Sequence, residues 1–221
     1  MDVIYTRRYG MSVKKDTYKI QAQTIIKNLA RRNMEGFYCD TKEDAVKKAL
    51  EIMEKGSVIA WGGSESIKEC GLMEAISDGS YELIDRTKAV TPDEQRKLYA
   101  SIVMSDYYLM STNAITLDGE LVNIDGNGNR VAALIHGPAH VLIIAGMNKV
   151  TADVESGYKR VKEAACPPNA VRLKKEIPCA LTGCCADCLA PQCFCNQIVV
   201  TRRSGHEGRI KIILVGEELG Y

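Results

Sequence analysis

Apolar strand segments alternate with amphipathic helix segments along most of this chain, and the alternation limits the folds that it can adopt. The strand segments include "SVIAWGGS", "YYLMSTNAIT", "HVLIIAGMN" and "GRIKIILVGEELGY". Strands buried on both faces of a parallel sheet read as such continuous apolar runs, because helices cover both faces. The pattern therefore predicts one α/β domain over residues 1–221, with a mainly parallel, doubly wound sheet flanked by helices.

Helix signals lie between these strands. The first predicted helix covers about residues 16–33, with Ile20, Ile25, Ile26 and Leu29 on its apolar side. Thr91 and Pro92 supply an N-cap and a first-turn proline for another helix. The segment before Pro167-Pro168 is predicted to be a helix that ends at this proline pair. Besides the first, the predicted helices cover residues 40–56, 65–79, 91–106 and 150–166.

Composition excludes several classes of protein. The chain has 46% apolar and 26% charged residues and a formal net charge of +1, so no basic surface is indicated for nucleic acid. It contains neither an apolar run long enough to span a membrane nor the apolar core of a signal peptide. We therefore expect a cytoplasmic protein that binds no membrane. In that reducing compartment, its nine cysteines are expected to be thiols or metal ligands and not a disulfide framework.

The turn "WGGS" is the first candidate site. Gly62 and Gly63 follow a buried strand, and Ser64 opens a helix. Glycines allow a ligand to approach the backbone, and a helix N-terminus favours an anion. These residues are predicted to bind a carboxylate or phosphate. The alternative is a tight strand-to-helix turn in which Ser64 is only the N-cap.

The loop "STNAITLDGELVNIDGNGNRV" is the second candidate site. Its small polar residues and glycines could line a polar cleft, with Arg130 as a fixed cation. Asp118, Glu120 and His136 are candidates for proton transfer, and Asn113 for orienting a ligand. The candidate ligand-binding residues in this loop are Asn127 and Arg130. The alternative is that the Asn and Gly residues only supply turn conformations.

Six cysteines fall within the short segment Pro178–Cys195. Cys179, Cys185, Cys188 and Cys195 have the spacing C-x5-C-x2-C-x6-C, which is compact enough to surround one Zn²⁺ ion or an iron–sulfur cluster. We predict this Cys-rich elaboration over residues 178–196. Reduced cysteines that only pack a loop are the alternative. Cys39, Cys70 and Cys166 are predicted to be core residues.

Four stretches in this order resemble the lactate-utilization-protein (LUD) domain family: "VIAWGGSESIKECGL", "STNAITLDGELVNIDGNGNRVAALIHGP", "KVTADVESGYKRVKEAACPPNAVRL" and "PCALTGCCADCLAPQCFCN". The resemblance covers roughly residues 16–221 and implies a fold similar to ribose-5-phosphate isomerase, glucosamine-6-phosphate deaminase and CoA transferases. In those proteins the ligand lies at the carboxyl ends of the strands. The two candidate sites would then be two walls of one cleft.

The resemblance also implies a link to the oxidation of L-lactate to pyruvate in iron–sulfur-containing complexes, without defining a reaction for a stand-alone member. The four cysteines match the pattern of short family members, whereas Cys184 and Cys193 look like additions, and Glu65 and Ser66 depart from the residues common after GGS. The expected partners are a small anionic metabolite and iron–sulfur subunits, with a homodimer as a further expected assembly. The alternatives are a metal- or cluster-bearing redox or accessory module, and a ligand-binding protein without catalysis.

Overall fold

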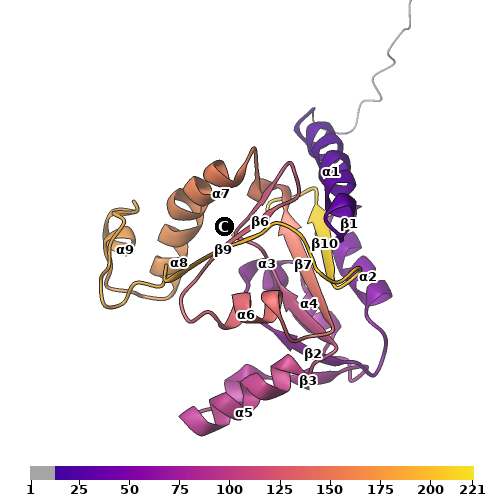
Figure 1. Ribbon diagram of the computed structural model, residues 1–221, viewed down its shortest axis with the longest axis horizontal. Coiled ribbons are helices and arrows are strands. Elements are labelled where there is room, and N and C mark those ends of the chain that lie inside the picture. Colours follow the sequence, from indigo (N-terminus) through magenta and orange to yellow (C-terminus); the bar gives the residue numbers. More distant parts are fainter. Residues whose placement is uncertain (1–12) are drawn as a thin grey trace, which may run out of the picture.

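The computed structural model describes residues 13–221, and its central feature is a six-stranded sheet in which every neighbouring pair is parallel (Figure 1). The strand order is β1-β10-β7-β4-β2-β3. Its strands are β1 (Glu35–Cys39), β2 (Val58–Trp61), β3 (Glu82–Ile84), β4 (Tyr107–Met110), β7 (His140–Gly146) and β10 (Ile210–Val215). The predicted mainly parallel α/β sheet is confirmed.

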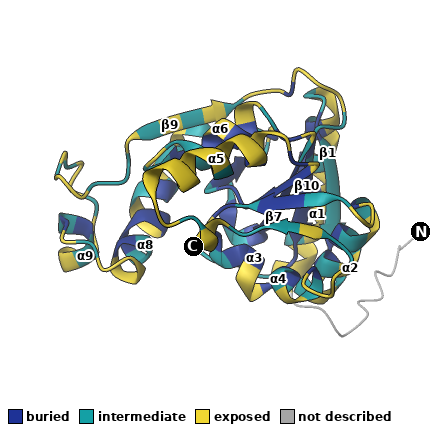
Figure 2. Cartoon of the chain, turned by 90° about the horizontal axis from the view of Figure 1, so that it is seen from below, coloured by how far each residue is buried: buried dark blue, intermediate teal, exposed yellow. Residues whose placement is uncertain are grey.

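Helices cover both faces of this sheet. Side chains alternate along β7, so Val141 and Ile143 enter one core while Leu142 and Ile144 enter the other. The first core is closed by α1 (Val13–Arg31), α5 (Pro92–Val103) and α6 (Asn129–Ile135). The second is closed by α2 (Lys42–Ile52), α3 (Glu65–Glu69) and α4 (Leu72–Ala75). Figure 2 shows β7 and β10 largely buried, whereas α5 is mostly exposed.

Local signals explain where several helices start and stop. Thr91 caps α5 through a reciprocal capping box with Glu94, and Pro92 occupies the first turn, as predicted. The helix predicted over 65–79 is instead two short helices. They are separated at Gly71, whose φ of 82° lies in the left-handed region. A short 3₁₀ turn, Arg86–Lys88, follows β3.

A second sheet was not predicted. The run Tyr107–Thr116 contributes β4 to the parallel sheet and then, after Ser111–Asn113, β5 to the other sheet. The second sheet has the order β8-β5-β6-β9, with β5–β6 and β6–β9 antiparallel. Its strands are β5 (Ala114–Thr116), β6 (Leu121–Asp125), β8 (Val150–Thr151) and β9 (Gln197–Thr201).

The predicted helix end at Pro167-Pro168 is wrong. Helix α7 (Val154–Arg160) passes through a π turn, Val161–Ala165, directly into α8 (Cys166–Arg172). Both prolines stand in the first turn of α8, where the missing N–H groups are tolerated. Helices α7, α8 and α9 (Pro178–Thr182) lie together on the side of the molecule opposite α1 and α2 (Figure 1).

Within residues 13–221, no helix combines the length and apolar character needed to cross a membrane.

Gly146, at the end of β7, is predicted to tolerate no side chain. An added Cβ would lie 2.4 Å from Asn148 Oδ1, 2.5 Å from Leu219 N and 2.6 Å from Glu217 O. Because two of these atoms belong to the backbone, Gly146→Ala should lower the free energy of unfolding by about 3 kcal/mol. Urea unfolding followed by circular dichroism measures this loss.

Gly205→Ala is the matched control. Among the described residues, no atom lies within 4 Å of an added Cβ at Gly205. We expect a change of less than about 0.5 kcal/mol there. Equal losses in the two variants would contradict the packing described around Gly146.

Candidate functional site

A cleft of about 380 Å³ lies at the carboxyl ends of the parallel strands. Segments after β2, β3, β4 and β7 meet there with the loop after β6, and α8 forms part of the wall. Ligands of open α/β sheets bind at this end of the strands. The polar residues of its lining include Ser64, Glu65, Ser66, Arg86, Ser111, Thr112, Asn113, Asp125, Asn127, Arg130, Lys149, Arg172, Lys175 and Tyr221.

The structure brings together most of the ligand-binding residues that the sequence suggested. Gly63, Ser64, Asn127 and Arg130 all line the cleft, and so does Asn113. Gly62 packs behind it, since an added Cβ there would lie 3.0 Å from Tyr108 Oη. The turn and the loop are thus neighbouring walls of one cleft.

Ser64 is the N-cap of α3. Its Oγ accepts a hydrogen bond from Ile67 N at 3.3 Å, and its residue is 9% exposed. Ile67 and the rest of this short helix therefore hold Ser64 at the edge of the cleft. Both roles considered from the sequence, helix cap and cleft residue, fall on the same side chain.

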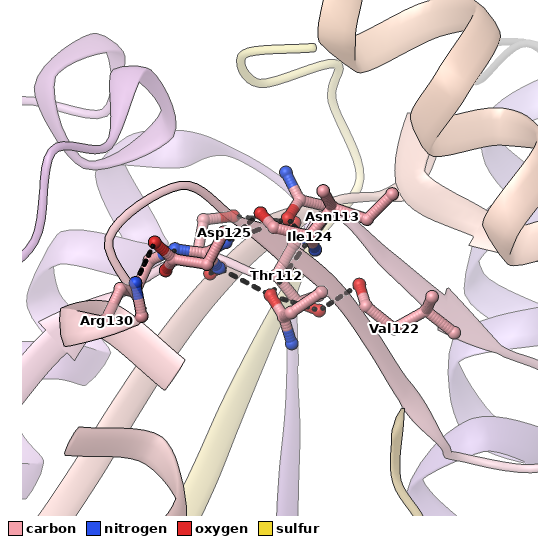
Figure 3. A network of polar contacts seen from close by, with 9 residues as sticks. Thr112, Asn113, Val122, Ile124, Asp125 and Arg130 are labelled. Carbon is pink, nitrogen blue, oxygen red and sulfur yellow. Dashed lines mark hydrogen bonds and ion pairs between the residues drawn. The ribbon is translucent and has the colours of Figure 1, made fainter. Parts of the chain in front are cut away.

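The Arg130 guanidinium is held by the protein itself (Figure 3). NH1 donates to Asn123 Oδ1 at 2.5 Å and to the Ser111 carbonyl at 3.4 Å. NH2 donates to the Ile124 carbonyl at 2.7 Å and to Asn113 Oδ1 at 3.0 Å. The third nitrogen, Nε, forms an ion pair with Asp125 at 3.3 Å.

These contacts change the role expected of Arg130. The group joins the segment after β4 to the end of β6, and so connects the two sheets beside the cleft. Asn113 takes part in the same network, because its Oδ1 also accepts from Ile124 N at 3.1 Å. Since each guanidinium nitrogen has a protein partner, Arg130 positions the wall of the cleft and does not offer a free cation.

The proposed proton-transfer groups of the loop are not brought to the cleft. Glu120 forms an ion pair with Arg32 at 3.3 Å, and the Asp118 carbonyl accepts from Arg32 Nε at 2.7 Å. Both acids flank the turn between β5 and β6, and neither is among the residues that line the cleft. His136 is exposed at the end of α6.

Lys149 is the functional candidate that sequence reasoning missed. It ends the 3₁₀ turn Met147–Lys149 after β7, lines the cleft and is only 3% exposed. Its Nζ donates to Ser66 Oγ at 2.8 Å and to Ser111 Oγ at 3.0 Å. Burial lowers the pKa of this amine to about 7, and the nearby cations Arg160 and Arg130 act in the same direction.

A sequence signal for Lys149 exists in hindsight. The lysine comes three residues after the strongly apolar strand that ends "IIAG", at the same sheet edge as the GGS turn. A charged residue placed directly after a buried strand of a parallel sheet points to the ligand-binding edge.

Five basic residues and two acidic residues line the cleft within residues 13–221. Both acids are already paired: Asp125 with Arg130, and Glu65 with Lys68 at 3.1 Å and with Arg172 at 3.3 Å. The Arg86 guanidinium lies against Gly63, and among the described residues it has no hydrogen-bond acceptor or carboxylate partner. The cleft therefore carries an excess of positive charge.

The nine cysteines are all free thiols. Cys39, Cys70 and Cys166 are buried, as predicted. Cys166 also lines the cleft, and its Sγ lies 3.4 Å from Cys195 Sγ. This contact raises the pKa of Cys195, and burial adds to the effect.

Cys179, Cys185 and Cys188 lie near Cys195 in the same segment, and the nearby thiols contribute to the raised pKa of Cys179 after burial. In the part of the chain that the structure describes, no group of three His, Cys, Asp or Glu side chains is arranged to share a metal ion. The zinc ion or iron–sulfur cluster at Cys179, Cys185, Cys188 and Cys195 therefore stays a prediction from the cysteine spacing.

Replacing Arg130 tests its role between the sheets. Arg130→Lys keeps the charge but loses the planar fork, which would remove one donor from each of the buried acceptors on Asn113 and Asn123. We expect the free energy of unfolding to fall by about 3 kcal/mol. Thermal and urea unfolding measure the change.

Arg96→Lys, on the exposed face of α5, is the matched control and should leave stability unchanged. If Arg130→Lys were as stable as this control, the guanidinium would not be holding the two sheets together.

Comparisons with known proteins identify the family of this chain. A crystal structure of a DUF162 family protein from Deinococcus radiodurans is similar to this chain, with 15% identity and a TM-score of 0.48 over 93% of this chain and 99% of that one. Among curated proteins, none matches. The family model of the LUD domain matches residues 22–215, which is most of the chain. The chain therefore belongs to the LUD domain family.

Proposed function

We propose that the cleft binds a small carboxylic acid of the 2-hydroxy or 2-oxo type, in the lactate-type carbon metabolism with which the family is associated. The observation that carries the proposal is the unpaired Arg86 guanidinium beside Gly63, in a cleft whose own acids are already neutralised. A guanidinium binds a carboxylate through charge-assisted hydrogen bonds. Ser64 and Asn127 line the same cleft and supply neutral polar contacts.

The charge distribution favours one carboxylate over a phosphate ester. Arg130 is held by its own network, and the pKa of Lys149 near 7 leaves its charge incomplete at neutral pH. Arg172 forms an ion pair with Glu65 at 3.3 Å, so its charge is not free to hold a second negative charge of a ligand. A singly charged acid therefore suits this cleft better than a dianion.

Oxidation of a 2-hydroxy acid would need an acceptor for two electrons. The sequence has no nicotinamide-binding glycine fingerprint. Under this proposal, an iron–sulfur partner subunit would take the electrons, and the present chain would bind and orient the acid.

Calorimetric titration with L-lactate, pyruvate and inorganic phosphate tests the proposal. We expect both carboxylic acids to bind more tightly than phosphate. Arg86→Gln should weaken their binding about tenfold, which corresponds to one charge-assisted contact.

Arg96→Gln removes the same charge from an exposed helix outside the cleft and should leave affinity unchanged. The proposal fails if neither acid binds, or if the two variants bind the acids equally well.

A further inference from the structure

The Lys149 amine is placed differently from an ordinary anion-binding lysine. It is nearly inaccessible to bulk water, yet it lines the cleft between Ser66 and Ser111, which are themselves 1% and 7% exposed. Among the described residues, no carboxylate lies within ion-pair distance of its Nζ. Gly220 packs beside it, because an added Cβ there would lie 2.7 Å from Ser66 Oγ and 3.5 Å from Lys149 Nζ.

The hydrogen-bond directions around this amine are informative. Ser66 Oγ lies 3.1 Å from the Leu219 carbonyl, and Ser111 Oγ lies 3.3 Å from the Thr112 carbonyl. Because a carbonyl can only accept, each hydroxyl directs its own proton away from Lys149 and accepts from the amine. The lysine is therefore not placed to deprotonate either serine, as a serine nucleophile would require.

A neutral amine has two N–H groups and one lone pair. The two serine hydroxyls account for both N–H groups, so the lone pair remains free for an electrophile in the cleft. The charged groups that act on Lys149 are Arg160 and Arg130, which disfavour protonation, and Glu69, which favours it more weakly. The neutral form is thus substantially populated near neutral pH.

We propose that Lys149 forms a covalent imine with the carbonyl carbon of a 2-oxo acid bound in this cleft. The inference rests on the proposed carboxylate site and deepens it, because it selects 2-oxo acids among the acids that the cleft could hold. The carboxylate would be held by Arg86 and the cleft's polar groups, and the carbonyl would face the lysine.

The step balances without an oxidant or reductant. The Lys149 lone pair attacks the carbonyl carbon, a C–N bond forms, and the π electrons of the C=O bond move to oxygen. One amine proton passes to that oxygen, which gives a carbinolamine. The hydroxyl group then leaves with the second amine proton as water, and a C=N bond remains. Such imines are a recognised form of lysine covalent catalysis.

Reductive trapping tests the inference on the full chain. The protein is incubated with pyruvate and sodium cyanoborohydride, and the adduct is located by intact-mass and peptide mass spectrometry. We expect one reduced pyruvate group per chain, on the peptide that contains Lys149. L-lactate, which has the carboxylate but no carbonyl, should give no adduct.

Two variants sharpen the test. Lys149→Met should abolish trapping, whereas Lys97→Met, which removes an exposed lysine of α5 outside the cleft lining, should retain it. Trapping of the wild-type chain should also speed up as pH rises through about 7, while surface lysines with a pKa near 10.5 react only at higher pH. Mapping on the wild-type chain decides the site even if Lys149→Met does not fold.

The outcomes separate this inference from the proposed function. If pyruvate and lactate bind calorimetrically but Lys149 is not modified, the imine is disproved and the carboxylate site stands. If adducts appear only on exposed lysines, the imine is equally disproved. If neither acid binds, both proposals fall.

Discussion

The Arg130 guanidinium is the interaction on which the geometry of the cleft depends. It joins the segment after β4 to the end of β6 through buried hydrogen bonds and an ion pair with Asp125 (Figure 3). Because the chain leaves the parallel sheet at Ser111 and enters the second sheet at Ala114, something must fix the angle between the sheets. The planar fork of an arginine can do this with several acceptors at once, which a lysine cannot. The same contact holds Ser111 where its hydroxyl meets Lys149.

The cations of the cleft have different roles, because they differ in their ion pairs and in their burial. Arg130 is held by its protein partners, Arg172 pairs with Glu65, and Lys149 is partly neutral because it is buried beside other cations. Among the described residues, Arg86 and Lys175 are left without a carboxylate or hydrogen-bond acceptor, and the Arg86 guanidinium is the one that lies against Gly63. A site of this kind combines a fixed charge for a carboxylate with an amine that can react with a carbonyl.

The cysteine-rich segment packs against this region, through Phe194 in the cleft lining and through the contact of Cys195 with Cys166.

Much of the fold could be predicted from the sequence, because each central strand is a continuous apolar run and Thr91-Pro92 is a strong local helix start. The sequence also predicted that the GGS turn and the loop of residues 111–131 lie together. This prediction rested on the rule that ligands bind at the carboxyl ends of strands, and on the family resemblance. The second sheet could not be predicted, since "YYLMSTNAIT" reads as one strand although Ser111–Asn113 divides it between two sheets. The proline pair was misleading because a π turn places it at a helix start. Local sequence patterns do not predict tertiary packing. They could therefore not show that Glu120 pairs with Arg32 outside the cleft, or that Lys149 is buried.

The buried amine of Lys149 is the central claim, and its titration by NMR tests it most directly. Lysine labelled with ¹³C at Cε gives a separate signal for each side chain, and Lys149→Met assigns the one of interest. Because burial disfavours the charged form and Arg160 and Arg130 oppose it further, the amine should lose its proton as pH rises through about 7. A midpoint near 7 is the predicted result. A midpoint close to 10.5, the value of an exposed lysine, would contradict the account.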